Sequence, residues 1–164
     1  MDGDIKALLM RYLTQLDTVV EKIPPELFAT ALADDMFSLE MNAKIAANFA
    51  LRGYCPLARV EEVSFFTSQA GKQAVRQQIA QTLAYLAAEP ALLHWQDDRI
   101  LKDKAGETTI ALAPFEFFHH YIVPNMLFHL SMVYAIARTN GVALSKGDMD
   151  GLHRYSLGFS FLPK

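Results

Sequence analysis

Residues 117–137 read FFHHYIVPNMLFHLSMVYAIA and contain no Asp, Glu, Lys or Arg. About 20 apolar residues suffice to cross a bilayer, so this stretch imitates a membrane span. Its interruptions argue against that reading, because each polar group buried in lipid needs a partner; they are His119, His120, Pro124, Asn125, His129 and Ser131. A helix that is apolar on nearly all sides is also typical of the centre of a helical bundle. We therefore expect a buried bundle helix and no membrane partner.

Two amphipathic helices are predicted from periodicity before this stretch. Residues 5–23 repeat apolar side chains at alternating steps of three and four, and Pro24 follows them. Proline lacks an N–H and cannot continue a helix, so the first helix ends there. A later helix is expected over about 68–88, where Pro90 closes a similar pattern. Its inward side chains are predicted to be Val75, Ile79, Thr82, Leu83 and Leu86.

Between these lies a predicted helix rich in alanine. Asp34 or Asp35 can cap its start, and Gly53 is expected to end it. Small side chains on one face allow close approach of a neighbouring helix; they are Ala43, Ala46, Ala47 and Ala50. Residues 54–66 are predicted to form a loop.

A small β-hairpin is expected before the long apolar helix. Residues 99–101 and 108–112 are β-prone, and Gly106 lies in the turn signal between them. Such a hairpin is too small to be stable alone and must lie on the bundle. Pro114 suits the first turn of the following helix, and Pro124 predicts either a kink or a short helix followed by a long one.

These elements predict an all-α fold, a four-helix bundle with the hairpin inserted before the last long helix. We expect one domain over residues 1–164, with its core at about 5–140 and an irregular tail over 141–164. Composition agrees with one globular domain: 52% of the 164 residues are hydrophobic, and 20% are charged. A single cysteine, Cys55, excludes a disulfide scaffold and a cysteine-rich zinc site.

The charge of the chain limits the classes of partner that we expect it to bind. The formal net charge is −3, and no segment is strongly basic, so a nucleic-acid partner is not expected. The first residues are acidic and do not resemble a secretory signal, which predicts a cytoplasmic protein. Phosphate-binding glycine loops, the HExxH zinc motif and the GxSxG nucleophile motif are all missing from the sequence. Nothing near Cys55 would lower its pKa, so we interpret it as an ordinary cysteine.

Among the histidines, His129 is the candidate functional residue. His94 and His153 lie in loop-like segments, and the adjacent His119 and His120 cannot both face one site. His129 is in the middle of an apolar helix, four residues after Asn125, so the two side chains share a face. It is either a core histidine hydrogen-bonded to Asn125 or to a neighbouring helix, or a ligand or general base.

The second helix offers partners for His129. Asp35 and Asn42 are two turns apart on one face, and bundles build metal sites from carboxylates and imidazoles on facing helices. Alternatively, Asp35 caps the helix and Asn42 is a buried amide satisfied across the interface. The candidate pocket therefore comprises Asp35, Asn42, Asn125 and His129, with Tyr134 nearby, in a largely apolar lining of Phe and Met.

Two runs resemble a known family. LADDMFSLEMNAKIAANFA (32–50) and VPNMLFHLSMVYAIARTNGVALSKGDM (123–149) are similar to a family of unknown function in the DinB/YfiT-like superfamily, many members of which hold a divalent metal ion. The resemblance implies a four-helix bundle, commonly a homodimer. It also implies a divalent metal such as Zn, Ni or Mn on three histidines, one from the second helix and two spaced four apart on the last. Some relatives are thiol-dependent transferases or isomerases.

This sequence departs from the superfamily's ligand set. Asn125 stands where the first histidine of the spaced pair is expected, Asn42 stands where relatives usually carry glutamine, and residues 34–52 contain no histidine. Only His129 matches, which makes it the candidate metal ligand. Three hypotheses follow: a small-molecule pocket protein with or without a metal, a non-catalytic homodimer packed through the alanine-rich helix and the apolar tail, and a metal-dependent thiol transferase.

Overall fold

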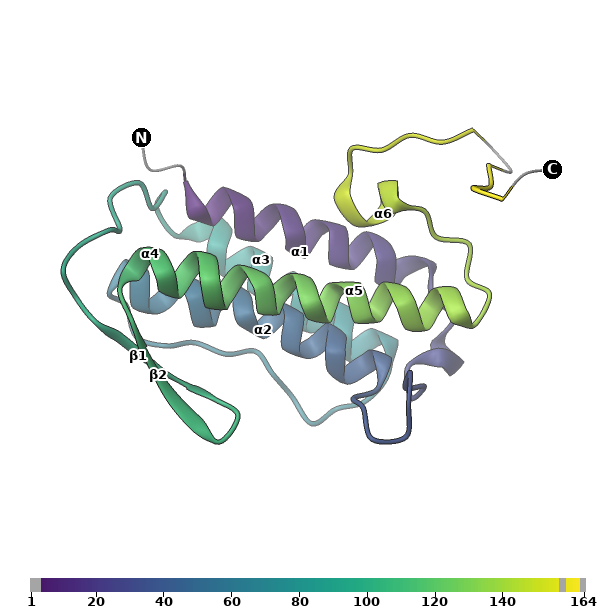
Figure 1. Cartoon of the computed structure of the whole chain (residues 1–164), viewed down its shortest axis with the longest axis horizontal. Helices are drawn as coiled ribbons and strands as arrows, with labels where there is room; N and C mark the ends of the chain where they lie inside the picture. Colours follow the sequence, from purple (N-terminus) through teal and green to yellow (C-terminus); the bar gives the residue numbers. More distant parts are fainter. Residues whose placement is uncertain (1–3, 157–158, 163–164) are drawn as a thin grey trace.

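The computed structural model describes residues 4–156 and 159–162. The long helices lie side by side as a bundle: α1 (Ile5–Lys22), α2 (Leu39–Ala58), α3 (Lys72–Ala88) and α5 (Val123–Thr139), as Figure 1 shows. A 3₁₀ turn, η1 (Pro25–Leu27), follows α1. Strands β1 (Leu101–Ala105) and β2 (Thr108–Leu112) form an antiparallel hairpin in which Leu101 pairs with Leu112. The predicted all-α bundle with an inserted hairpin is confirmed. No helix within the described residues is long and apolar enough to cross a membrane.

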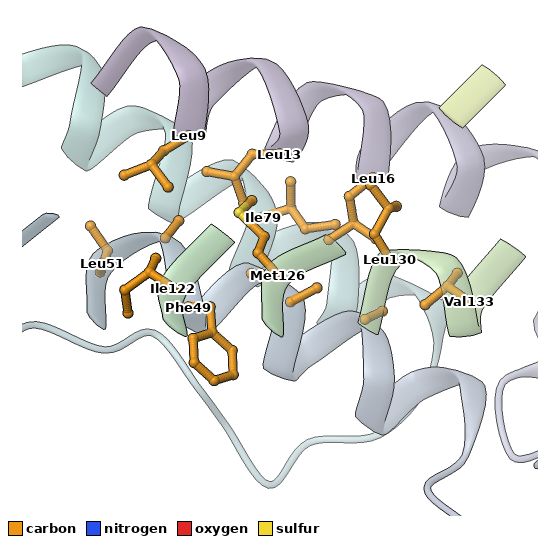
Figure 2. Packing of buried hydrophobic residues seen from close by; sticks show 14 of the residues in the cluster. Leu9, Leu13, Leu16, Phe49, Leu51, Ile79, Ile122, Met126, Leu130 and Val133 are labelled. Atoms are coloured by element: carbon orange, nitrogen blue, oxygen red, sulfur yellow. The ribbon is translucent and has the colours of Figure 1, made fainter. Parts of the chain in front are cut away.

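The core lies between these helices. Side chains of α1 point towards Ile79 of α3 and towards the α5 face that carries Met126 and Leu130 (Figure 2). The residues that α1 contributes to the core include Leu9, Leu13 and Leu16, which are fully buried. Helix α2 packs most extensively against α5. The four alanines predicted to let helices approach are all buried inside the chain.

The start of α2 differs from the prediction. Ser38, not Asp34 or Asp35, is the N-cap, and its hydroxyl accepts from the Met41 N–H at 3.2 Å. Asp34 and Asp35 lie instead in an exposed loop over residues 31–38, whose ends meet in a bridge between Ala31 and Ser38. The Leu39 N–H donates to the Thr30 carbonyl at 2.7 Å just below that bridge. Tertiary hydrogen bonds at the loop ends therefore decide where α2 begins.

The end of α2 also differs. The helix continues through Gly53 and Pro56 to Ala58, so residues 54–58 are helical rather than a loop. A Cβ added to Gly53 would approach Ile122 Cγ2 to 2.5 Å, so this glycine serves close packing rather than helix termination. Pro56 lies in the last turn, and Arg59, in the left-handed region with φ 60°, ends the helix.

Smaller corrections concern α3 and the hairpin. Helix α3 begins at Lys72, after Gly71 with φ 94°, rather than near residue 68. Strand β1 begins at Leu101, where residues 99–101 were expected, whereas β2 matches its predicted range. The hairpin lies on the bundle because Arg52 of α2 makes two hydrogen bonds to Asp103, at 2.6 and 2.8 Å.

A π-helical turn precedes α5. The chain runs from α4 (Pro114–Glu116) through η2 (Phe117–Ile122) into α5 as one continuous rod. The Val123 N–H donates to Phe118 O, five residues back, so the backbone register shifts just before Pro124, which has no N–H to donate. The π-helical turn therefore takes the place of the predicted kink.

The tail is less irregular than predicted. A short helix, α6 (Lys146–Asp150), begins with a capping box in which Ser145 and Asp148 exchange hydrogen bonds. Lys22 of α1 pairs with Asp148 at 2.6 Å, which holds the segment against the bundle.

Candidate functional site

His129 joins the two helices that pack most extensively. Its side chain is 8% exposed on α5, and its Nδ1 lies 2.8 Å from Asn42 Oδ1 on α2. The sequence predicted a partner at Asn125 or on a neighbouring helix, and in the structure the partner is Asn42 of α2. The imidazole stacks on Phe49, with ring centroids 6.0 Å apart, and meets Phe128 edge-on at 5.1 Å.

The hydrogen bonds of Asn42 fix the tautomer of His129. Asn42 Nδ2 donates to the Phe37 carbonyl at 3.0 Å and to the Ser38 carbonyl at 2.9 Å. Both of its amide hydrogens are therefore used, and the atom facing His129 is an oxygen that can only accept. His129 must donate from Nδ1, so the lone pair of the neutral ring lies on Nε2. Within the described residues, Nε2 makes no hydrogen bond.

Burial keeps this imidazole neutral. Desolvation lowers the pKa of His129 from its ordinary value of 6.5, because the charged form loses its hydration inside the bundle. The neutral ring is then the dominant species at neutral pH. An anchored neutral imidazole is a hydrogen-bond acceptor and a base through Nε2.

A pocket of about 430 Å³ opens at His129. The loop over residues 31–38 forms one wall, and the first turns of α2 and the middle of α5 form the others. Its lining combines two carboxylates, apolar side chains and the histidine–asparagine pair, and comprises Asp34, Asp35, Met36, Phe37, Asn42, Phe128 and His129.

Three of the five predicted pocket residues come together here: Asp35, Asn42 and His129. Asp34, Met36, Phe37 and Phe128 were not named, although the predicted lining of Phe and Met describes three of them. Two signals were available: Phe128 precedes His129, and Asp34 to Phe37 lie within the run that resembles the family.

The other two predicted residues are used elsewhere. Asn125 Nδ2 donates to the Tyr121 carbonyl at 2.7 Å, within its own helical rod. The Tyr134 hydroxyl points to the Leu144 carbonyl at 3.4 Å. Neither side chain lines the pocket. His94, His119, His120 and His153 are all exposed.

The donor set does not fit the superfamily's metal site. No group of three His, Cys, Asp or Glu side chains within the described chain could hold an ion. His129 Nδ1 and Asn42 Oδ1 are already bonded to each other, and one imidazole remains where three are needed. Cys55 offers no thiolate either, because it is buried in α2 and burial raises the pKa of its thiol.

A second hollow of about 410 Å³ lies between α1 and α3. Its charged groups already satisfy one another, because Arg76 pairs with Asp17 at 3.0 Å. Of the described residues that line this hollow, the other polar ones are Gln73 and Gln77, and both are exposed.

Comparisons with known proteins agree with the fold. The family model described as "Domain of unknown function (DUF1993)" matches residues 6–150. A crystal structure of a DinB family member protein from Shewanella denitrificans has a TM-score of 0.71, with 22% identity over 92% of each chain. No curated protein matches this chain. The match over most of its length shows that the chain belongs to the DUF1993 family, a domain of unknown function, and its fold is like that of the DinB family member.

Proposed function

We propose that this protein binds a small organic molecule in the pocket at His129, where Nε2 of the neutral ring accepts a hydrogen bond from the ligand. The observation that supports this most directly is the bond between His129 Nδ1 and Asn42 Oδ1, at 2.8 Å. It commits one ring nitrogen to the scaffold and leaves the other free beside a pocket. His129 lines the pocket and its Nε2 makes no hydrogen bond within the described residues, so a ligand donor can approach it.

The size and lining of the pocket support a ligand with an apolar body. Its volume of about 430 Å³ lies in the range of small-molecule sites. Met36, Phe37 and Phe128 offer apolar contact, and His129 offers one directed polar contact, which is the usual division of roles in such sites.

The same geometry makes His129 the candidate base if the bound molecule reacts. Its Nε2 can accept a proton near neutral pH, and Asn42 Oδ1 would hold the resulting imidazolium through Nδ1–H. This chemistry belongs to the protein's own side chains and uses no divalent ion. A metal-dependent thiol transferase is less well supported, because the donor set lacks two imidazoles and the cysteine is buried.

Nuclear magnetic resonance on ¹⁵N-labelled protein tests the proposal. The probes share a phenyl ring and a two-carbon stem and differ in the head group: 2-phenylethylamine, 2-phenylethanol and 3-phenylpropanoate. We expect at least one probe to shift the His129 Nε2 resonance in a saturable way. Calorimetry extends the test to His129→Phe, which has no such resonance: this variant should lose the binding, and His120→Ala, which changes an exposed histidine, should not. No saturable shift with any of the three would contradict the pocket function.

A homodimer is the second candidate, and the exposed tail favours it. Phe159 stacks on Tyr155 with centroids 4.7 Å apart and meets Phe161 at 4.9 Å, while Phe161 is 82% exposed. Leu157, Gly158 and Pro163 of the same apolar tail lie outside the described residues. The alanine-rich face cannot contribute, because it is buried in the chain. Light scattering should give a dimer mass that falls towards the monomer in Phe159→Ser/Phe161→Ser; a monomeric wild type would exclude this candidate.

A further inference from the structure

We infer that the ligand of the His129 pocket is a small primary amine, bound as its ammonium ion and carrying an apolar stem. The inference rests on the proposed function and adds the chemical class of the ligand. It follows from which hydrogen-bonding atoms of the lining side chains remain free.

Two neutral side chains of the pocket carry hydrogen-bond donors, and the donors of both already have acceptors. The Nδ1–H of His129 is bonded to Asn42, and the amide hydrogens of Asn42 are bonded to the carbonyls of Phe37 and Ser38. Among the described residues that line the pocket there is no Lys, Arg, Ser, Thr, Tyr or Trp. The lining side chains therefore have acceptors to offer and no donors.

The free acceptors are negatively charged or electron-rich. The carboxylates of Asp34 and Asp35 are exposed at the pocket and make no hydrogen bond or ion pair with another described residue. Nε2 of His129 is the third acceptor, on a residue that is 8% exposed and lines the pocket. An ammonium group has several donors and no acceptor, so it complements this set, whereas a carboxylate or phosphate would meet like charge and no donor.

The apolar lining suits a cation on an organic stem. Phe37 and Phe128 are 57% and 53% exposed, so much of each phenyl ring is open for contact with a ligand. Aromatic faces attract cations and also bury hydrocarbon, so these rings can cover the stem and support the ammonium together. The Met36 thioether adds a polarisable contact. A free inorganic cation would use the carboxylates alone and leave the rings exposed.

The three probes named above separate this inference from the function on which it rests. We expect 2-phenylethylamine to bind about tenfold more tightly than 2-phenylethanol, with 3-phenylpropanoate weakest, when dissociation constants are measured by calorimetry at neutral pH. Equal or tighter binding of the alcohol or the carboxylate would overturn the amine and leave the pocket function standing. No binding by any probe would remove both.

Charge-neutralising variants test the role of the carboxylates. Asp34→Asn/Asp35→Asn should weaken 2-phenylethylamine severalfold and leave 2-phenylethanol nearly unchanged. The matched control Asp98→Asn/Glu107→Gln removes the same charge from exposed residues outside the pocket and should leave both constants unchanged. An equal loss in the control would assign the effect to net charge and overturn the site. Salt should weaken the amine more than the alcohol.

A lysine side chain presents the same ammonium on a protein. Nα-acetyl-lysine amide distinguishes this source from a free amine. We expect it to bind more weakly than 2-phenylethylamine, because it has no ring to lie against Phe37 and Phe128. Tighter binding of the lysine probe would overturn the assignment to a small free amine.

Discussion

Asn42 Oδ1 accepts the Nδ1 hydrogen of His129 at 2.8 Å, across 87 residues of sequence and between the two most extensively packed helices. The same amide uses its nitrogen to hold the carbonyls of Phe37 and Ser38, at the start of α2. One asparagine therefore both orients the histidine and ties it to the loop that walls the pocket. Changes at either residue should affect pocket chemistry and local stability together.

Asn42→Asp should raise the pKa of His129 above that in the wild type. A carboxylate beside Nδ1 stabilises the imidazolium, which opposes the lowering caused by burial. The substitution also removes the donor to two carbonyls, so we expect the free energy of unfolding to fall by about 1–3 kcal/mol. Titration of the His129 ring by NMR measures the first effect. Asn48→Asp, on the same helix but bonded to Ser64, is the control. An unchanged or lower pKa in Asn42→Asp would contradict the assigned hydrogen bond.

The depressed pKa of His129 makes stability depend on pH in a defined window. The folded state holds the proton less tightly than the unfolded chain, whose pKa is near 6.5. The stabilising contribution is therefore complete above pH 6.5 and is lost as pH falls through the folded-state pKa. Wild type should lose up to about 1.4 kcal/mol per pH unit more than His129→Phe in this window, as measured by urea unfolding.

The carboxyl of Asp150 begins to lose its stabilising contribution at a lower pH than His129 does. Backbone N–H groups of His153 and Leu152 lower the pKa of Asp150 from 3.8 to about 2, so that stabilisation disappears only in strong acid. Parallel stability curves for wild type and His129→Phe between pH 7 and 5 would refute the role assigned to this histidine.

Local patterns were enough to predict some elements. Periodicity over residues 5–23 predicted α1, because its stripe is continuous and a proline pair follows it. The β-prone run over residues 108–112, next to the turn signal at Gly106, likewise predicted β2. The predicted start of α2 was wrong. Asp34, Asp35 and Ser38 can all cap a helix, and hydrogen bonds to the carbonyls of residues 28 and 30 determine which of them does. No local sequence pattern shows which of the three residues caps the helix.

The part of the site that lies on helices could be predicted, because helical periodicity indicates which side chains face inward. The positions of Asn42 and His129 on their helices placed both side chains inward, and the structure joins them. Asn125 lies one turn before His129, but its amide donates to the Tyr121 carbonyl four residues back and does not line the pocket. The path of the loop over residues 31–38 could not be inferred, and that path brings Asp34 and Phe37 to the pocket.

Gly53→Ala should destabilise the bundle by about 1–3 kcal/mol, although alanine is the better helix former. The new Cβ would lie 2.5 Å from Ile122 Cγ2, a distance that side chains do not tolerate. Ile122→Ala removes the clashing atoms and should cost about 2–5 kcal/mol alone, through the cavity that it leaves. The double variant should be more stable than the sum of the two changes predicts. Additive losses in urea unfolding would show that the contact is not the cause.

Asp103→Ala should loosen the hairpin while leaving the bundle folded. It removes the two hydrogen bonds and the ion pair between Arg52 and Asp103, the charged part of the contact that joins α2 to β1, while Arg52 and Tyr121 still donate to the Lys104 carbonyl. An isolated two-stranded hairpin is marginal in water, so its amides should exchange faster once the anchor is lost. Hydrogen–deuterium exchange of residues 101–112 measures this. Lys102→Ala, an exposed change on the same strand, should leave exchange unchanged; equal acceleration in both variants would contradict the anchoring role.

Asn42→His/Asn125→His should create a zinc site that the natural donor set does not offer. The first substitution places an imidazole where an amide oxygen now lies 2.8 Å from His129, and the second places one a single turn before it on the same rod. Three imidazoles match the ligand number of catalytic zinc sites. We expect about one zinc per chain after gel filtration and a zinc-dependent rise in melting temperature. Asn48→His/Asn140→His adds the same number of histidines elsewhere and should bind no more zinc than wild type. If the first variant gains no affinity over this control, positions 42 and 125 do not face the space beside His129 in the way that metal-binding relatives require.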